Sequence, residues 1–450
     1  MTSERKCLKC QGILPADAPE GLCPSCLLQQ AMATLPDKTL LLSKQMATQT
    51  IRSHDVPPES PAQPRVKLRR VGAADSPDAE CDFQLLSMLG QGGMGLVYQA
   101  RQTSISRSIA LKMMRSAKSD DQDRQALFLA EALVTGQLDH PNIVPIYDLG
   151  MDEAGHLFYA MKELKGRPWS DSIGHATLQE NLDVLLRVGD AVAFAHSRGV
   201  IHRDLKPQNV MLGDYGEVVL MDWGLAAAIT TGTPALRVSQ STALCGTPAY
   251  MAPEMANGLW NRIGPQSDIY LLGAILFEIL EGAPPHLMGN DDATDALTAA
   301  RLNKIADFKT PGELQDIARK AMATEPADRF ASVKDFQAAI RVFREHQESD
   351  RLAVLARQRF EAALASKRYD DYAESVFGYR QALRLWPDNP AAQQGLNQAS
   401  LQYARTALDQ GDLDLALSLL KEEDETQRKL AQKVRQRLEE RTRQTARIRA

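Results

Sequence analysis

Hydrophobic and polar positions follow two different periods along this chain. Three short runs of β type, LLSMLG, GLVYQA and SIALKMM, lie between residues 85 and 114. Longer stretches follow in which apolar residues recur at helical spacing, as in NLDVLLRVGDAVAFAHSRG and SDIYLLGAILFEILEG. Short strands followed by long helices indicate one α+β domain of enzyme size, which we place at residues 81–346.

The segments on either side of this domain have other patterns. Residues 29–80 show little periodicity and carry a cluster of prolines, which interrupt helices and central strands, so we expect a flexible linker. From residue 350 onward glycine is scarce and the spacing is helical, which predicts an all-α region. We divide this region into helices at 347–425 and a basic helical tail at 426–450.

Composition and charge exclude several classes of protein. The 450 residues are 44% hydrophobic and 24% charged, which is typical of a globular protein with two or three domains. The net charge of −5 is too small to indicate nucleic acid or a membrane surface as a partner. No apolar run is long enough to span a membrane, and none follows the charged start MTSERKCLKC, so we expect a cytoplasmic protein.

A glycine-rich turn, LGQGGMGLVY, joins the first two runs of β type. Glycine lets backbone N–H groups approach phosphate oxygens closely, so the turn indicates a phosphate-binding loop, although a plain hairpin or a dinucleotide-binding fold would share it. Lys112 lies on the next run between apolar neighbours, where its charge is costly to bury without an anion. A phosphate, together with Glu131 on the helical stretch FLAEALVTGQL, would supply that anion.

Three further motifs follow in a fixed order. They are His202-Arg203-Asp204-Leu205-Lys206-Pro207-Gln208-Asn209, Asp222-Trp223-Gly224 and Ala252-Pro253-Glu254. With the glycine loop, the lysine and the helical glutamate, this series resembles the protein kinase family over residues 83–343. The form of the glycine loop is similar to that of the eukaryotic-like Ser/Thr kinases of bacteria. The resemblance implies a bilobal fold, with an antiparallel β lobe and a mainly α-helical lobe.

The resemblance also implies catalytic roles in phosphoryl transfer from ATP. Lys112 would contact the α and β phosphates and would be held by Glu131. Asp204 would accept the hydrogen bond of the incoming hydroxyl and act as the base. Lys206 would neutralise charge on the transferred group.

Mg²⁺ and the nucleotide have their own sets of expected contacts. Asn209 and Asp222 supply oxygen ligands of the kind that Mg²⁺ prefers. Met161 would be the gatekeeper before a hinge at 162–164. The residues expected to contact the nucleotide are Leu89, Gly90, Gln91, Gly92, Gly93, Met94, Gly95, Leu96, Val97, Ala110, Lys112, Met161, Glu163 and Met211.

One position departs from the family pattern, since Trp223 stands where most kinases have Phe. Both are large aromatic side chains, so we expect altered packing rather than lost activity. Lys112, Asp204 and Asp222 are all present, which favours an active enzyme. The alternative is a signalling scaffold in which a pseudokinase-like core binds nucleotide with little turnover.

Substrate class and control follow from the same resemblance. Lys206 and the segment GTPAY at 246–250 are of the Ser/Thr type, and Thr247 would hydrogen-bond both Asp204 and Lys206. Arg203 would face a phosphorylated side chain of the activation loop, which implies control by autophosphorylation, although an ordinary polar loop is the alternative. The loop offers Thr230, Thr231, Thr233, Ser239, Ser241 and Thr242.

Two residues would have structural roles in the helical lobe. Asp268 would anchor the backbone of the catalytic loop from the central helix. Arg329 would form an ion pair with Glu254.

Two CxxC pairs, twelve residues apart, lie in the first 26 positions. Four thiolates match the tetrahedral coordination of Zn²⁺, so residues 1–28 are predicted to form a structural zinc ribbon that binds a partner. Disulfides and a redox pair are the alternatives, which the lack of a signal sequence and the duplication of the motif disfavour. The expected ligands are Cys7, Cys10, Cys23 and Cys26.

The C-terminal region is similar to tetratricopeptide repeats. Tyr372, Tyr379, Ala382 and Pro387 fall at repeat positions, and Gly411 and Ala416 do so in a second helical pair. The period of 41 residues exceeds the usual value of about 34, so a helical bundle without a peptide groove is an equal alternative. A repeat array would bind partner proteins.

The last 25 residues carry nine Lys and Arg against two Asp and Glu, a net charge of +7. Leu430, Val434 and Leu438 form one apolar stripe, which is too short for a coiled coil. The charge predicts docking to an acidic partner, and a solvated helix is the alternative.

Overall fold

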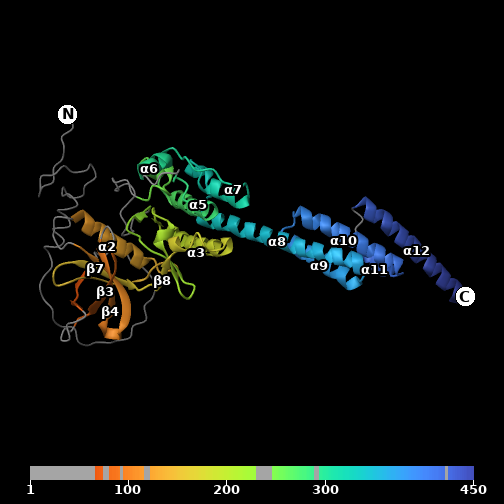
Figure 1. Cartoon of the computed structure of the whole chain (residues 1–450), viewed down its shortest axis with the longest axis horizontal. Helices are drawn as coiled ribbons and strands as arrows, with labels where there is room; N and C mark the ends of the chain where they lie inside the picture. Colours follow the sequence, from red (N-terminus) through yellow and green to blue (C-terminus); the bar gives the residue numbers. More distant parts are fainter. Residues whose placement is uncertain are drawn as a thin grey trace, which may run out of the picture. The chain divides into compact units, whose positions relative to one another are not determined.

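The computed structural model describes most of the chain beyond residue 65. The described residues are 66–73, 81–91, 95–115, 122–229, 246–287, 293–420 and 424–449. They divide into two compact units (Figure 1). Among the described residues, those within 66–139, 143–165 and 222–229 belong to the first unit, and those within 140–142, 166–221 and 246–449 belong to the second.

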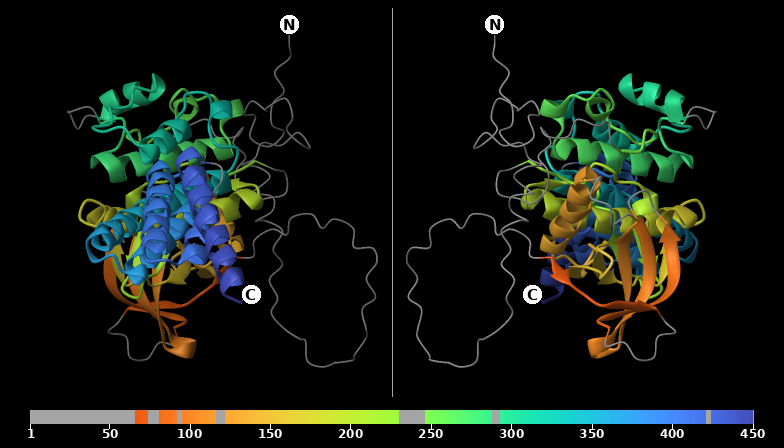
Figure 2. Two further views of the ribbon diagram at one scale, coloured as in Figure 1. Left: turned by 90° about the vertical axis from the view of Figure 1, so that its right-hand side faces the viewer. Right: turned by 90° about the vertical axis from the view of Figure 1, so that its left-hand side faces the viewer.

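The first unit is built on a seven-stranded sheet in the order β1-β6-β7-β5-β4-β3-β2. The five longer strands pair antiparallel, and α2 lies beside the strands (Figure 2). The elements are β1 (Lys67–Leu68), β2 (Val71–Ala73), β3 (Phe83–Gln91), β4 (Gly95–Gln102), a 3₁₀ turn (Thr103–Ile105), β5 (Arg107–Met114), α2 (Gln122–Gln137), β6 (Ile146–Met151), β7 (Leu157–Lys162) and β12 (Ala227–Ala228).

The strand predictions are confirmed, because the three runs of β type form β3, β4 and β5. Alternating side chains such as Ile109 and Leu111 are buried with Phe83 and Phe158 in one apolar cluster. The two short edge strands, β1 and β2, were not predicted; they lie in the segment expected to be a linker. Strand β1 pairs parallel with β6, and β2 pairs parallel with β3. Backbone hydrogen bonds hold these two strands, and two or three residues are too few to show an alternating apolar pattern.

The second unit is mainly helical and contains one small sheet, in the order β11-β10-β8. Its first elements are β8 (Gly166–Pro168), a 3₁₀ turn (Trp169–Asp171), α3 (Leu178–Ser197), β9 (Val200–Ile201), a 3₁₀ turn (Pro207–Asn209), β10 (Val210–Gly213) and β11 (Val218–Leu220). The elements that follow are α4 (Pro253–Ala256), a 3₁₀ turn (Trp260–Arg262), α5 (Pro265–Glu281), α6 (Ala293–Arg301), α7 (Glu313–Ala321) and a 3₁₀ turn (Pro326–Asp328).

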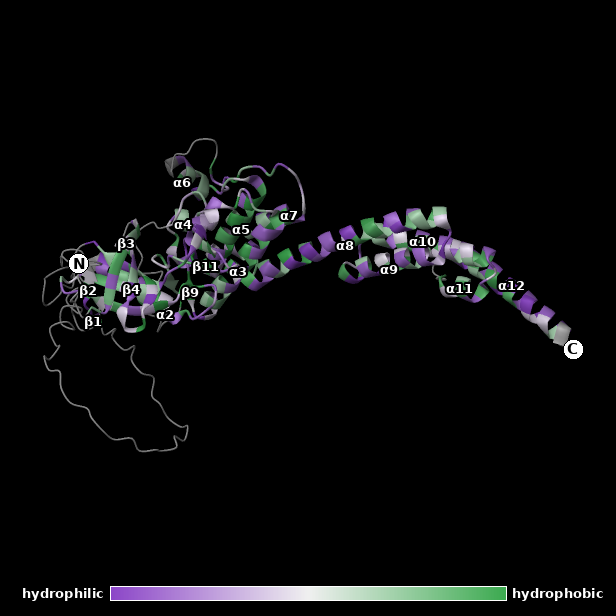
Figure 3. Ribbon diagram, turned by 60° about the horizontal axis from the view of Figure 1, so that its bottom comes forward, coloured by the Kyte–Doolittle hydropathy of each residue, from purple (hydrophilic) through white to green (hydrophobic). Residues whose placement is uncertain are grey.

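Local sequence sets the ends of the two central helices. Thr177 and Glu180 form a capping box that starts α3. Pro265 occupies the first position of α5, and Gly282 ends it in the left-handed conformation, with φ of 83°. Every residue of α5 from 267 to 277 is buried, and Figure 3 colours this helix largely as hydrophobic. Helix α5 therefore lies in the core of the second unit.

One long helix, α8 (Val333–Ser366), continues from this core into the C-terminal region. Near its start, the Gln337 amide donates to the Leu186 carbonyl at 2.7 Å and to Asp190 at 2.8 Å, both on α3. Farther along, Ser349 donates to the Ala382 carbonyl at 2.8 Å. The domain boundary predicted between 346 and 347 thus falls inside a continuous helix.

The C-terminal region is helical, as predicted. It comprises the end of α8, α9 (Tyr369–Leu385), α10 (Pro390–Asp409), α11 (Leu413–Ser418) and α12 (Glu425–Arg449). The apolar stripe of α12 packs within the chain, since Val434 is fully buried in a cluster with Leu408 and Leu413. No helix of the described ranges is both long and apolar enough to cross a membrane. The predicted fold class, α+β with an all-α C-terminal region, is confirmed.

Candidate functional site

Helix α5 anchors the loop that carries Asp204. The carboxylate of Asp268, fully buried in that helix, accepts hydrogen bonds from the backbone N–H groups of His202 at 2.8 Å and Arg203 at 2.9 Å. Burial raises the pKa of Asp268, but hydrogen bonding to His196 and the nearby histidine charges lower it overall. The anchoring role predicted for Asp268 is confirmed. Arg203 has φ of 69°, a strained backbone that this anchoring holds in place.

Asp204 lies at the centre of a polar cluster in the second unit and is 8% exposed. Its Oδ1 accepts a hydrogen bond from the Thr247 hydroxyl at 2.7 Å, and its Oδ2 lies 2.9 Å from Lys206 Nζ. Lys206 also donates to the Thr247 hydroxyl at 2.7 Å, as predicted. Burial raises the pKa of Asp204, but the hydrogen bonds from Lys206 and Thr247 outweigh it and lower the pKa. The carboxylate is therefore ionised at neutral pH.

Asn209 completes this cluster. Its amide nitrogen donates to the Asp204 carbonyl at 2.8 Å and to the Asp204 carboxylate at 3.2 Å. Its carbonyl oxygen accepts no hydrogen bond within the described parts of the chain, which leaves a hard oxygen donor of the kind that Mg²⁺ takes. Met211 follows on β10 and is partly exposed.

Lys112 and Glu131 meet in the first unit, as predicted. Lys112 Nζ lies 2.7 Å from Glu131 Oε1 and 2.9 Å from Oε2. Glu131 is buried on α2 and Lys112 is partly buried on β5. A third donor, the Tyr159 hydroxyl, reaches Glu131 Oε1 at 2.8 Å. No sequence motif points to Tyr159, because this residue lies in the ordinary apolar run LFYAM.

The glycine loop is described at its two ends. Gly90 pairs with Val97, and a Cβ added at Gly90 would meet nothing within 4 Å. A Cβ at Gly95 would lie 2.4 Å from the Met113 carbonyl oxygen, so only glycine fits there. Leu89, Gln91 and Leu96 flank the loop on the same two strands, whereas Gly92, Gly93 and Met94 lie outside the described residues.

The expected hinge follows β7. Met161 is buried at the end of this strand and pairs with Ala110 on β5, which is also buried. Glu163 accepts a hydrogen bond from the Gln99 side chain at 2.8 Å. Val97 and Gln99 alternate with Tyr98 along β4 and so face the same side of the sheet.

Asp222 and its neighbours also belong to the first unit. Asp222 has φ of 58°, an uncommon conformation for a residue other than glycine, and its side chain is exposed. The described residues offer its carboxylate no hydrogen bond or ion pair, so both oxygens can serve as metal ligands. Trp223 is 1% exposed, which agrees with a packing role for the aromatic ring.

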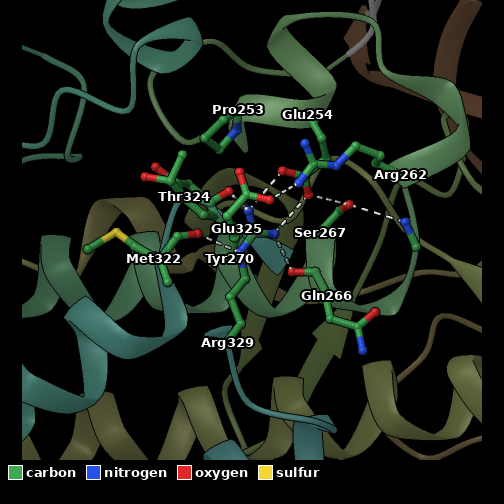
Figure 4. Close-up of polar contacts among 12 residues, drawn as sticks. Pro253, Glu254, Arg262, Gln266, Ser267, Tyr270, Met322, Thr324, Glu325 and Arg329 are labelled. Carbon is green, nitrogen blue, oxygen red and sulfur yellow. Dashed lines mark hydrogen bonds and ion pairs between the residues drawn. The ribbon is translucent and has the colours of Figure 1, made fainter. Parts of the chain in front are cut away.

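The predicted pair between Glu254 and Arg329 is confirmed. The guanidinium donates to both carboxylate oxygens at 2.8 Å, and both side chains are buried (Figure 4). Arg329 also donates to the carbonyls of Ala323 and Gln266, each at 2.8 Å, and Ser267 donates to Glu254 at 2.6 Å. This network ties the segment after Thr247 to α5.

Several predicted sites fall outside the part of the chain that the structure describes. The four cysteines Cys7, Cys10, Cys23 and Cys26 lie outside the described residues. The same holds for the loop side chains Thr230, Thr231, Thr233, Ser239, Ser241 and Thr242. Within the described ranges, no cluster of three or more His, Cys, Asp or Glu side chains could hold a metal ion.

Comparisons with known proteins agree with this geometry. A family model described as "Protein kinase domain" matches residues 83–355. Serine/threonine-protein kinase PknD of Chlamydia trachomatis is 32% identical over 294 residues, which cover 58% of this chain and 31% of the relative.

Two further relatives have similar identity. Probable serine/threonine-protein kinase PknB of Bifidobacterium longum is 33% identical over 275 residues, covering 57% of this chain and 39% of the relative. Serine/threonine-protein kinase PrkC of Bacillus subtilis is 31% identical over 270 residues, covering 58% of this chain and 40% of the relative. The chain thus matches well under half the length of each of these relatives.

Proposed function

Because the chain belongs to the protein kinase family, we propose that it transfers the γ-phosphoryl group of ATP to Ser and Thr hydroxyls of other proteins. The observation that carries this proposal is the cluster around Asp204. An ionised carboxylate there, flanked by the Lys206 ammonium and the Thr247 hydroxyl, provides a base beside a cation. The printed names of the relatives, all Ser/Thr kinases, support the substrate class.

Each residue has a definite task in this proposal. Asp204 accepts the hydrogen bond of the incoming hydroxyl and orients it, and Lys206 neutralises negative charge on the group in transfer. Lys112, held by Glu131, binds the α and β phosphates. Magnesium, when bound with the nucleotide, supplies charge neutralisation on the phosphates.

The residues available for metal and nucleotide fit these groups. Asn209 has a free carbonyl oxygen and Asp222 a free carboxylate, so both would hold Mg²⁺. Gly90, where a Cβ would meet open space, would let the loop backbone approach the phosphates. The other nucleotide contacts expected from the sequence remain part of the proposal.

Phosphotransfer from labelled ATP in the presence of Mg²⁺ tests this function. Wild-type protein should label itself or a generic Ser/Thr peptide, and Lys112→Met should not. Nucleotide binding without any labelling would instead favour the signalling scaffold. Phosphorylation of the loop at 230–242, which Arg203 would face, is the proposed form of control.

The N-terminal cysteines carry a second proposal, a structural zinc ribbon at residues 1–28 that binds a protein partner. Reduced protein should contain about one Zn²⁺ per chain, because four thiolates complete one tetrahedral site. Chelation should release the metal and unfold this segment while ATP binding persists. Metal analysis that finds no zinc in reduced protein would remove the ribbon from the proposal.

The helices at 347–425 are proposed to bind a partner protein as a TPR-like array. The support is the helical hairpin of α9 and α10, whose facing residues Tyr372, Tyr379 and Tyr403 are buried with Ala382. The long helix α8 connects helices α9, α10 and α11 to the rest of the second unit.

The outward face of α12 is proposed to dock on an acidic partner. Its apolar stripe is already packed on α10 and α11, so deleting residues 426–450 would uncover that cluster. Neutralising Lys429, Lys433 and Arg437 to Gln is the sharper change, because all three are exposed. We expect weaker binding to poly-glutamate at low salt, no difference at high salt, and unchanged peptide phosphorylation.

The control for this prediction is a matched removal of three exposed charges elsewhere, Arg357→Gln on α8 with Arg380→Gln and Arg384→Gln on α9. Equal loss of binding in the control would show that net charge alone matters. Loss of peptide phosphorylation in the α12 variant at every salt concentration would show that α12 has a structural role.

A further inference from the structure

Tyr159 lies at the junction of the sheet and α2 in the first unit. It is buried on β7, and in the ladder between β5 and β7 it is the direct partner of Lys112. Residues paired directly across two strands project to the same face of a sheet. Both side chains therefore extend toward α2, which carries Glu131.

The two neighbouring strands thus supply two donors to one carboxylate. Glu131 Oε1 accepts from Lys112 Nζ at 2.7 Å and from the Tyr159 hydroxyl at 2.8 Å, whereas Oε2 accepts from Lys112 at 2.9 Å. The ring of Tyr159 packs against Phe128 of the same helix, with centroids 5.1 Å apart. Tyr159 therefore contacts α2 through both an apolar surface and a hydrogen bond.

The two donors to Glu131, the Lys112 ammonium and the Tyr159 hydroxyl, differ in flexibility and in the number of acceptors that they serve. Lys112 ends a flexible side chain, and in the proposed function its ammonium must also serve phosphate oxygens. The Tyr159 hydroxyl is fixed by a rigid buried ring and donates its hydrogen bond to Glu131. Burial, together with the charge of Glu131, raises the pKa of Tyr159 well above its usual value, so the hydroxyl keeps its proton and remains a donor.

We propose that Tyr159 is a positioning residue that holds Glu131, and through it α2 and Lys112, in the arrangement needed for phosphoryl transfer. The inference rests on the proposed function and adds a residue that belongs to none of the sequence motifs. Without the hydroxyl, the buried carboxylate of Glu131 keeps Lys112 as its sole side-chain donor within the described residues. When Lys112 shares its ammonium between Glu131 and phosphate, the polar contact between α2 and the sheet would then be weaker.

Tyr159→Phe tests this proposal, because it removes one oxygen and keeps the ring that packs on Phe128. We expect kcat/KM for ATP to fall about tenfold in the full chain, the effect of losing one hydrogen bond to a charged group. The backbone amides of α2 should exchange hydrogen at least about threefold faster, because local opening of the helix becomes easier. Tyr147→Phe, on β6 of the same unit, is the matched control and should change neither quantity.

A double-mutant cycle separates positioning from a merely structural role. If Tyr159 acts through Glu131, then Tyr159→Phe should cost less than about twofold in a Glu131→Ala background. Where the Glu131→Ala rate is too low to measure, the cycle is read on the affinity for a fluorescent ATP analogue. Equal losses in both backgrounds would overturn the proposal, and so would a wild-type rate in Tyr159→Phe.

Hydrogen exchange keeps this inference distinct from the proposed function. If wild-type protein shows no phosphotransfer, the kinase proposal fails, but faster exchange of α2 in Tyr159→Phe would still support the role of Tyr159. If wild-type protein is active and α2 exchanges equally in both proteins, the kinase proposal stands and the role of Tyr159 is wrong.

Discussion

Replacing Asp204 with asparagine should slow phosphoryl transfer by a factor of about 10³, the middle of the range for loss of a positioned base. The substitution keeps the size of the side chain and removes its negative charge. Thr247 and Lys206 both donate to the carboxylate, and an amide offers them one neutral acceptor oxygen. The incoming hydroxyl then loses the ionised acceptor that orients it.

Initial rates of peptide phosphorylation at saturating ATP measure this effect. Asp183→Asn is a suitable control, because Asp183 lies on α3 of the same unit and forms an exposed ion pair with Arg344 at 2.6 Å. Its rate should stay within about twofold of wild type, since exposed pairs contribute little. If Asp204→Asn incorporates label as fast as wild type, Asp204 is not the base and the proposed mechanism fails.

Replacing Arg329 with methionine should destabilise the second unit by about 3–5 kcal/mol, the usual cost of removing one partner of a buried ion pair. The carboxylate of Glu254 would remain buried with only the Ser267 hydroxyl as a side-chain donor among the described residues. The carbonyls of Ala323 and Gln266 would also lose their donor. A lower midpoint of urea unfolding, followed by helical circular dichroism, measures the loss.

Two comparisons make this prediction specific. Glu254→Gln should cost less than Arg329→Met, because the guanidinium keeps its carbonyl acceptors. Arg262→Gln removes the neighbouring ion pair with Glu325 shown in Figure 4, in which Arg262 is 38% exposed, and should cost less than about 1 kcal/mol. The prediction is wrong if Arg329→Met unfolds at the same urea concentration as Arg262→Gln.

Much of the fold was predictable because periodicity is a local property. The runs that became β3, β4 and β5 alternate apolar side chains, and the stretches that became α3 and α5 repeat them at helical spacing. Local residues also set two helix ends. Thr177 and Glu180 start α3, and Gly282 ends α5. No distant residue was needed to recognise these elements.

The candidate site was predictable for a different reason, namely that its residues lie in short motifs typical of one family. The resemblance implied that Asp268 anchors the catalytic loop, that Thr247 bridges Asp204 and Lys206, and that Arg329 pairs with Glu254. The structure confirms all these contacts.

Only the tertiary structure decided the remaining features, because each depends on which distant segments become neighbours. Tyr159 meets Glu131 through the register of β7 on β5, and strand register cannot be read from either strand alone. The strands β1 and β2 exist through backbone pairing, which needs no side-chain pattern. The sequence alone assigns no partner to the apolar stripe of Leu430, Val434 and Leu438, and in the structure α10 and α11 cover it, since an apolar face does not by itself specify its partner.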